Sequence, residues 1–215
     1  MATKLGIMKG AVGILKESAV GIAVSDDTRL MNELNEVYDP VLGWALEQGL
    51  WNFATRTVAI DASEDVEPEF GYTFAIAKPD DYAGRFVSIS GDSFFACPLQ
   101  DYHEEGGLDG YIYCNVNPLY FRYISNGNEY GLNLADWPWT FARAVEYELA
   151  FRVAPHVTTM GEDSFSKLEG RKIRALRDAR SKDALNQGNQ YPPAGRLARS
   201  RGGMRGGAGS RRWND

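Results

Sequence analysis

The hydrophobic repeat of this chain changes its period twice along the sequence. Between Ser25 and Gly49 apolar residues recur every three to four positions, which is the spacing of one face of an α-helix. From Thr55 to Ile124 they alternate in short runs, as they do in antiparallel strands. The helical spacing returns at Asp136 and continues to Gln187. This order predicts an α+β fold, in which a small antiparallel β-domain is inserted into a bundle of three to four helices.

Four units follow from this order. We expect N-terminal helices over residues 1–54, a β-domain over 55–134, C-terminal helices of the bundle over 135–187 and a flexible basic arm over 188–215. A chain of 215 residues has the size of one domain with an appendage, so a second independent core is not expected.

The first helical segments carry their own start and stop signals. Residues 25–27, a serine followed by two aspartates, suit the N-cap and first turn of the first long helix, and Gly49 suits its end. Pro40 lies inside the pattern, so we expect it to kink this helix or to start a second one. A weaker, shorter helix is expected from Leu5 to Lys16.

The later helices begin after Pro138, a residue tolerated in a first turn. Pro155 is expected to end the first of them, and Thr159 with Glu162 forms a capping-box pair for the second. The packing face of the first is expected to contain Trp139, Ala142, Val145, Leu149 and Val153. The last helix is long, basic and poor in aliphatic residues, so we expect it to complete its packing on a neighbouring subunit.

Four alternating runs predict the strands of the β-domain. Turn-forming residues separate them, and together they predict a compact antiparallel sheet or small barrel. The runs are Thr57–Ile60, Tyr72–Ile76, Phe86–Ile89 and Leu119–Ile124.

Charge divides the chain into an acidic body and a basic end. Residues 1–165 carry 10 basic and 25 acidic side chains, a net charge of −15, whereas residues 166–215 carry 13 and 4, a net charge of +9. Basic tails of this kind contact nucleic acid or an acidic protein surface. The Gly/Arg/Ser-rich arm buries too little apolar area to offset its ordering entropy, so we expect it to be disordered in the isolated protein.

The sequence does not favour an enzyme. Cys97, Asp101 and His103 are the one grouping that could hold a nucleophile and a base, but the surrounding acidic residues are typical of an exposed loop. Acidic pairs such as Asp80–Asp81 are ordinary in turns, and neither a phosphate-binding loop nor a zinc-ligand spacing is present. We therefore expect no catalytic role and no cofactor or metal, and we expect reduced thiols, no secretion signal and no membrane contact.

Several motifs, taken in order, resemble one family of viral proteins. They start with a helix running from Thr28 to a Trp-Asn-Phe-Ala turn at 51–54, followed by strands that end with 119–124, Leu-Tyr-Phe-Arg-Tyr-Ile. An Ala-rich helix pair and a terminal run from Ala175 to Gly195 complete the set. The chain resembles the tail tubular protein A-like family of phage head-to-tail adaptors, or connectors, over roughly residues 25–200.

The resemblance implies a structural role in the virion. Members of this family form a ring, usually of twelve copies, beneath the portal protein, where they extend the DNA channel and receive a downstream tail protein. The implied location is the head–tail junction of a virion whose parts are made in the host cytoplasm. Genomic DNA would then pass through the lumen during ejection, and an acidic wall would let it slide.

Two sets of residues are candidates for the contacts that the resemblance implies. The arm would bind the portal, and the last helix would form a ring or portal interface. The arm residues are Tyr191, Pro192, Pro193, Arg196, Arg199, Arg201, Arg205, Arg211 and Arg212, and the helix residues are Arg171, Lys172, Arg174, Arg177 and Arg180.

Other interpretations of the arm stay open. The stretch after Arg201 is RGG-like, so the alternative function is nonspecific nucleic-acid binding through an arginine-rich tail. A solvated tail without a partner is the third reading. Tryptophan is frequent at interfaces, and one of Trp44, Trp51, Trp137 and Trp139 is expected to face a partner while the others pack in the core.

Overall fold

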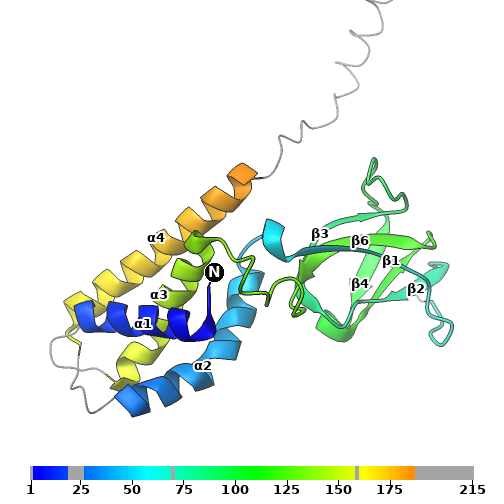
Figure 1. Ribbon diagram of the computed structural model, residues 1–215. Helices are drawn as coiled ribbons and strands as arrows, with labels where there is room; N and C mark the ends of the chain where they lie inside the picture. Colours follow the sequence, from blue (N-terminus) through cyan, green and yellow to red (C-terminus); the bar gives the residue numbers. More distant parts are fainter. Residues whose placement is uncertain (1, 19–26, 69–70, 158–159, 187–215) are drawn as a thin grey trace, which may run out of the picture.

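The computed structural model describes residues 2–18, 27–68, 71–157 and 160–186. These residues form a helical bundle and a β-domain that lie side by side (Figure 1). The bundle consists of α1 (Lys4–Ser18), α2 (Asp27–Glu47), α3 (Trp139–Val157) and α4 (Glu162–Asn186). Since the β-domain lies between α2 and α3 in the chain, the predicted α+β fold with an inserted antiparallel β-domain is confirmed. The arm, residues 188–215, lies outside the described residues.

The β-domain contains two three-stranded antiparallel sheets. One has the strand order β1-β6-β3 and the other the order β2-β5-β4. The strands are β1 (Thr55–Ile60), β2 (Phe74–Ala77), β3 (Tyr82–Ser90), β4 (Tyr102–Glu105), β5 (Tyr111–Cys114) and β6 (Leu119–Ser125), with short 3-10 helices η2 (Asn52–Ala54) and η3 (Gly107–Asp109). Residues from both sheets form one core cluster that includes Ile76, Ile89, Ile112 and Phe121.

Two of these strands were not among the four predicted runs. The segment around Asp101–Gly106 was expected to be an exposed loop, but Tyr102–Glu105 is β4, an edge strand of its sheet. Only Tyr102 of this strand is partly buried, whereas the other three residues are exposed. The loop prediction is therefore wrong. An edge strand with so little buried area has no alternating apolar pattern, so the sequence contained no sign of it.

The residues that form the bundle core recur at the helical spacing that the sequence predicted. Leu30, Leu34, Val41 and Leu46 of α2 are buried at helical spacing, and they share one cluster with the inner faces of α1 and α3. Pro40 lies inside α2, which continues as one helix to Glu47. Pro40 is exposed, so the carbonyl that lacks its N–H donor, that of the exposed Glu36, is close to water.

Helix ends differ slightly from prediction. Pro155 does not end α3, because the helix continues to Val157. Pro155 removes only the hydrogen bond to the carbonyl of Phe151, and the helix continues for two residues beyond it. The caps predicted at residues 25 and 26 and at Thr159 lie outside the described residues.

Aromatic rings join the bundle to the β-domain. Trp51, which precedes η2, and Phe53, which lies within it, both pack on Phe141 of α3 with ring centroids 4.8 Å apart. Trp137 packs on Phe141 at the same distance. The indole of Trp51 donates a hydrogen bond to the carbonyl of Ala45 at 2.9 Å. Ala83 and Ile124 of the β-domain also belong to the bundle's core cluster, so the two parts pack against each other. The β-domain has a second core cluster of its own, which the length of the chain did not predict.

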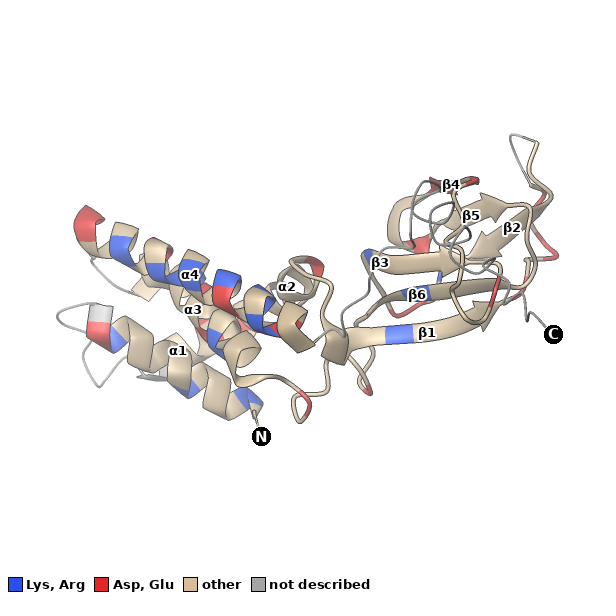
Figure 2. Cartoon of the chain, turned by 90° about the horizontal axis from the view of Figure 1, so that it is seen from above, with Lys and Arg blue, Asp and Glu red and all other residues tan. Residues whose placement is uncertain are grey.

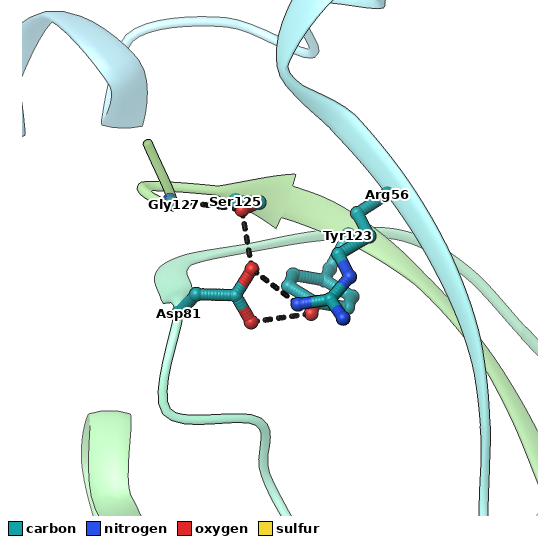
Figure 3. A network of polar contacts seen from close by, with 5 residues as sticks. All are labelled: Arg56, Asp81, Tyr123, Ser125 and Gly127. Atoms are coloured by element: carbon teal, nitrogen blue, oxygen red, sulfur yellow. Dashed lines mark hydrogen bonds and ion pairs between the residues drawn. The ribbon is translucent and has the colours of Figure 1, made fainter. Parts of the chain in front are cut away.

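A polar network closes the bundle-facing end of the first sheet (Figure 3). Asp81 accepts hydrogen bonds from Tyr123 at 2.6 Å, from Ser125 at 2.5 Å and from Arg56 at 2.8 Å. Burial opposes ionisation of Asp81, but these three hydrogen bonds outweigh it and hold its pKa below the ordinary value. The network ties β1 and β6 to the start of β3.

Candidate functional site

Helix α4 covers α3 along one side of the bundle (Figure 1). Glu162 and Asp163 place negative charge in its first turn, which complements the helix dipole. Its inner face consists of small or polar residues between a few apolar ones, with Leu168, Ala179 and Asp183 buried. Alanine lets two helices approach closely, so Leu168 and Ala179 pack within the chain, whereas Ile173 is 53% and Leu185 77% exposed. The expectation that the stripe completes its packing on a neighbouring subunit stays a prediction.

Lys172 contributes to this internal packing. Its ammonium group lies 3.5 Å from Oε2 of Glu148, a carboxylate that is 3% exposed, and 3.8 Å from the centroid of the Phe151 ring. Arg152 donates a hydrogen bond to the other carboxylate oxygen of Glu148, Oε1, at 2.8 Å. Lys172, one of the predicted interface residues, thus neutralises a buried charge inside the bundle.

The other four predicted helix residues are exposed. Arg171, Arg174, Arg177 and Arg180 lie on the outer side of α4, where Figure 2 shows a row of cationic positions. Arg180 donates a hydrogen bond to Gln48 at 3.1 Å, which directs it toward the end of α2. The exposed face of α4 therefore presents guanidinium groups to any partner.

A groove lies between α3 and α4 beside two of these arginines. Its cavity has a volume of about 280 Å³. Arg143, on the α3 side, is paired with Glu146 at 2.9 Å and lies over the ring of Tyr147. The lining residues are Trp139, Thr140, Arg143 and Tyr147 of α3 with Arg171, Arg174, Ala175 and Asp178 of α4. Aromatic surface flanked by guanidinium groups is typical of an interaction site for an anionic partner.

Trp139 occupies an unexpected position in this groove. It was predicted on the packing face of α3, but its side chain is 77% exposed. Trp137, two residues earlier, fills the core instead at 6% exposed, and its indole donates to the carbonyl of Gly131 at 2.8 Å. Trp139 is the first residue of α3, and the part of the helix that packs on the core begins after it, at Phe141. Trp51 is also buried and Trp44 partly buried, so Trp139 is the tryptophan that faces solvent among those the structure describes.

The C-terminal end of α4 is anchored to the turn before β1. Asp183 is 6% exposed, and both of its carboxylate oxygens accept hydrogen bonds from the backbone N–H of Asn52 at 3.2 and 3.1 Å. Burial raises the pKa of Asp183 although the hydrogen bonds from Asn52 oppose the shift. The last helical turn therefore ends at a fixed point beside the junction of bundle and β-domain.

The β-domain presents the opposite charge. Between Thr55 and Leu134 its described residues carry four basic and twelve acidic side chains. Lys78, one of the four, is 7% exposed and pairs with Glu104 at 2.7 Å. Its ammonium also donates a short hydrogen bond to the carbonyl of Gly107 in η3. Because Lys78 is buried in this way, the exposed charges of the β-domain are more acidic than its total composition indicates.

The candidate catalytic grouping has ordinary surroundings. Asp101 accepts a hydrogen bond from Tyr72 at 3.3 Å, and the ring of His103 stacks on Tyr113. Cys97 is exposed and Cys114 buried, and both are free thiols. Within the described residues no cluster of three or more His, Cys, Asp and Glu could hold a metal ion, and none of the helices there is long and apolar enough to cross a membrane.

Sequence reasoning placed the candidate site partly on residues that the structure does not describe. These are the arm residues Tyr191, Pro192, Pro193, Arg196, Arg199, Arg201, Arg205, Arg211 and Arg212. It missed the contribution of α3 to the groove, since Trp139 had been assigned to the core and Arg143 had drawn no interpretation. The available signal was the tripeptide Trp137-Pro138-Trp139, in which the two indoles cannot both lie on the inner face.

Comparison with known proteins found no family model that matches the chain and no curated protein that matches it.

Proposed function

We propose that this chain is a structural head-to-tail adaptor of a tailed phage virion. In this role copies form a ring beneath the portal protein, extend the DNA channel and attach a downstream tail protein. The basic arm fastens each copy to the portal, and no catalysis or cofactor is involved. The order of motifs that resembles the tail tubular protein A-like family is one support for this function.

The observation that carries the proposal is the rigid union of two differently built parts. Trp51, Phe53, Trp137 and Phe141 pack together where the chain enters and leaves the β-domain, and Ala83 and Ile124 of the β-domain join the bundle's core cluster. An adaptor has to hold two different neighbours at a fixed separation, and a closely packed junction provides that rigidity. The bundle would face the portal, and the β-domain would face the tail.

The anchored end of α4 supports the assignment of the arm. Asp183 holds the last turn of α4 against Asn52, so the chain beyond Asn186 starts from a defined point on the body. An arm that starts from a fixed origin and orders on binding can wrap a large surface on its partner.

The experiment uses the portal protein encoded by the same genome. Full-length chain and a version truncated after Gly188 are each mixed with portal rings, and attached protein is measured by co-sedimentation and electron microscopy. We expect the full chain to decorate the portal as a ring and the truncated chain, with an unchanged circular dichroism spectrum, to stay unbound. Normal attachment of the truncated chain would show that the arm assignment is wrong, and failure of the full chain to bind would reject the adaptor function.

The alternative is nonspecific nucleic-acid binding through the arginine-rich arm, and the exposed row Arg171, Arg174, Arg177 and Arg180 extends the basic surface toward it. That function requires tight binding to duplex DNA that weakens steeply as salt increases. The acidic body argues against it, since a net charge of −15 over residues 1–165 repels phosphates. Binding of isolated protein to labelled duplex at two salt concentrations separates the two functions.

A further inference from the structure

We infer that the groove between α3 and α4 binds the η3 turn of a second copy of this chain. The groove contributes Trp139, Arg171 and Arg174, and the turn contributes Glu105, Leu108 and Asp109. This inference rests on the proposed adaptor function and deepens it, because it names the two surfaces through which neighbouring copies meet.

The groove offers both apolar and cationic surface without an occupant. Trp139 is 77% exposed at the mouth of a cavity of about 280 Å³. Arg171 and Arg174 lie one helical turn apart on its α4 side, both are exposed, and neither forms an ion pair with another described residue. A large exposed indole in the same groove as exposed guanidinium groups is the composition of an interface core and its charged rim.

The η3 turn has the complementary composition. Leu108 is 52% exposed, and the acidic residues Glu105 and Asp109 lie on either side of it in the chain, both exposed. The turn thus presents two carboxylates and one apolar side chain, and the groove presents two guanidinium groups and one indole. The two surfaces are complementary in charge and in apolar content.

The turn is also held in one shape before any partner arrives. Gly106 and Gly107 have φ values of 81° and 64°, which other residues adopt only with strain. The buried ammonium of Lys78 fixes the turn by bonding Gly107 and pairing with Glu104. A preformed projection loses little conformational entropy when it binds.

Charge distribution favours a second copy over nucleic acid as the occupant. Both are anionic, but the acidic body repels phosphates, whereas the β-domain brings its carboxylates to the arginines of another copy. The groove lies on the bundle and the turn on the β-domain, so the contact joins two different surfaces. Contacts of this heterologous kind repeat from copy to copy and close into rings when the rotation allows.

The test exchanges charges between the two surfaces in the full chain. Variant one carries Arg171→Glu with Arg174→Glu, and variant two carries Glu105→Lys with Asp109→Lys. Self-association of wild type is measured by sedimentation velocity from micromolar to millimolar protein at low and moderate salt. We expect wild type to associate with an affinity that falls as salt rises. Each variant alone should associate at least about tenfold more weakly than wild type.

Mixing the two variants gives the decisive result. Each variant alone sets like charges against each other, but in the mixture the glutamates at 171 and 174 meet the lysines at 105 and 109, and the native arginines meet the native carboxylates. We therefore expect the mixture to associate as wild type does, with the two variants in equal numbers by native mass spectrometry. The matched control, Lys167→Glu with Arg177→Glu, makes the same charge change on exposed positions of α4 outside the groove and should leave association unchanged.

Other outcomes overturn the inference. These are a wild type that stays monomeric at millimolar concentration, variants that associate as wild type does, or a mixture that fails to recover. If the variant with Arg171→Glu and Arg174→Glu self-associates as wild type does but no longer binds a single-stranded oligonucleotide, the groove is a nucleic-acid site and not a contact between copies. Portal attachment is measured separately, so a chain that binds the portal without this contact would keep the adaptor function and lose only this inference.

Discussion

Asp183, in the last turns of α4, accepts hydrogen bonds from the backbone and the side chain of Asn52, a residue 131 positions earlier in the chain. The side-chain amide of Asn52 also donates to the carbonyl of Asp183 at 2.8 Å. The two residues thus bind each other through four contacts and join the end of the bundle to the turn that leads into β1. This connection fixes where the basic arm starts.

Replacing Asp183 should therefore destabilise the chain in a manner that depends on the replacement. Asp183→Ala removes the three partly buried hydrogen bonds that the carboxylate accepts from Asn52, and we expect it to lower the free energy of unfolding by about 1–2 kcal/mol. Asp183→Asn keeps an acceptor oxygen and should lose less. Urea denaturation followed by fluorescence measures both, and an alanine variant as stable as wild type would contradict the role given to this contact.

The same residue should produce a pH dependence. Burial raises the pKa of Asp183, so the folded chain binds this proton more tightly than the unfolded chain. Its contribution to stability is therefore greatest at low pH and declines as the pH rises above the ordinary value of 3.8. The stability of wild type relative to Asp183→Asn should fall over that range and then level off.

Asp81 should show the opposite dependence. Its three hydrogen bonds hold the pKa below 3.8 despite partial burial, so its contribution is present at neutral pH and is lost as the pH falls through the folded-state value. Asp81→Asn should lower the free energy of unfolding at pH 7 by about 2–3 kcal/mol and flatten the acid side of the stability profile. Asp80→Asn, an exposed neighbour, is the matched control and should leave the profile unchanged.

Replacing a buried tryptophan should lower the free energy of unfolding far more than replacing an exposed one. Trp51 is 1% exposed and packs on Phe141, so Trp51→Ala should lower the free energy of unfolding by about 3–5 kcal/mol. Trp139→Ala removes an exposed side chain and should change it by less than about 0.5 kcal/mol. Urea denaturation of both variants checks this, and similar losses would mean that Trp139 belongs to the core after all.

Two adjacent cations on α4 should also differ. Lys172→Ala leaves the buried carboxylate of Glu148 with Arg152 as its remaining cationic partner, and we expect a loss of about 2 kcal/mol. Arg171→Ala, one position earlier but exposed, should change stability by less than about 0.5 kcal/mol. A double-mutant cycle of Lys172 with Glu148→Gln would isolate the pair, and additive losses would exclude a direct interaction.

The sequence predicted the parts of the fold whose burial is regular. The runs 57–60 and 119–124 are paired strands in the structure, and α2 buries Leu30, Leu34, Val41 and Leu46 at the predicted spacing. These elements each have one face on a core, and the period of their apolar residues reports it directly. β4 was missed because an exposed edge strand of four residues has no such period.

The candidate site was harder to predict because it depends on distance through space. Lys172 and Arg171 are indistinguishable as neighbouring cations in the sequence, but one turns toward Glu148 and the other toward solvent. Trp139 follows the periodicity of α3, yet the core is already filled by Trp137. Tertiary packing decides which of two similar residues is buried, and the sequence alone does not show which one that is.

The chain leaves the bundle and re-enters it at almost the same place, since the rings of Phe53 and Trp137 lie 6.5 Å apart at the two crossings. A module whose two ends are neighbours can be enlarged, trimmed or replaced without stretching the scaffold that carries it. Selection can therefore reshape the β-domain to suit one neighbour while the helices keep the form that suits the other.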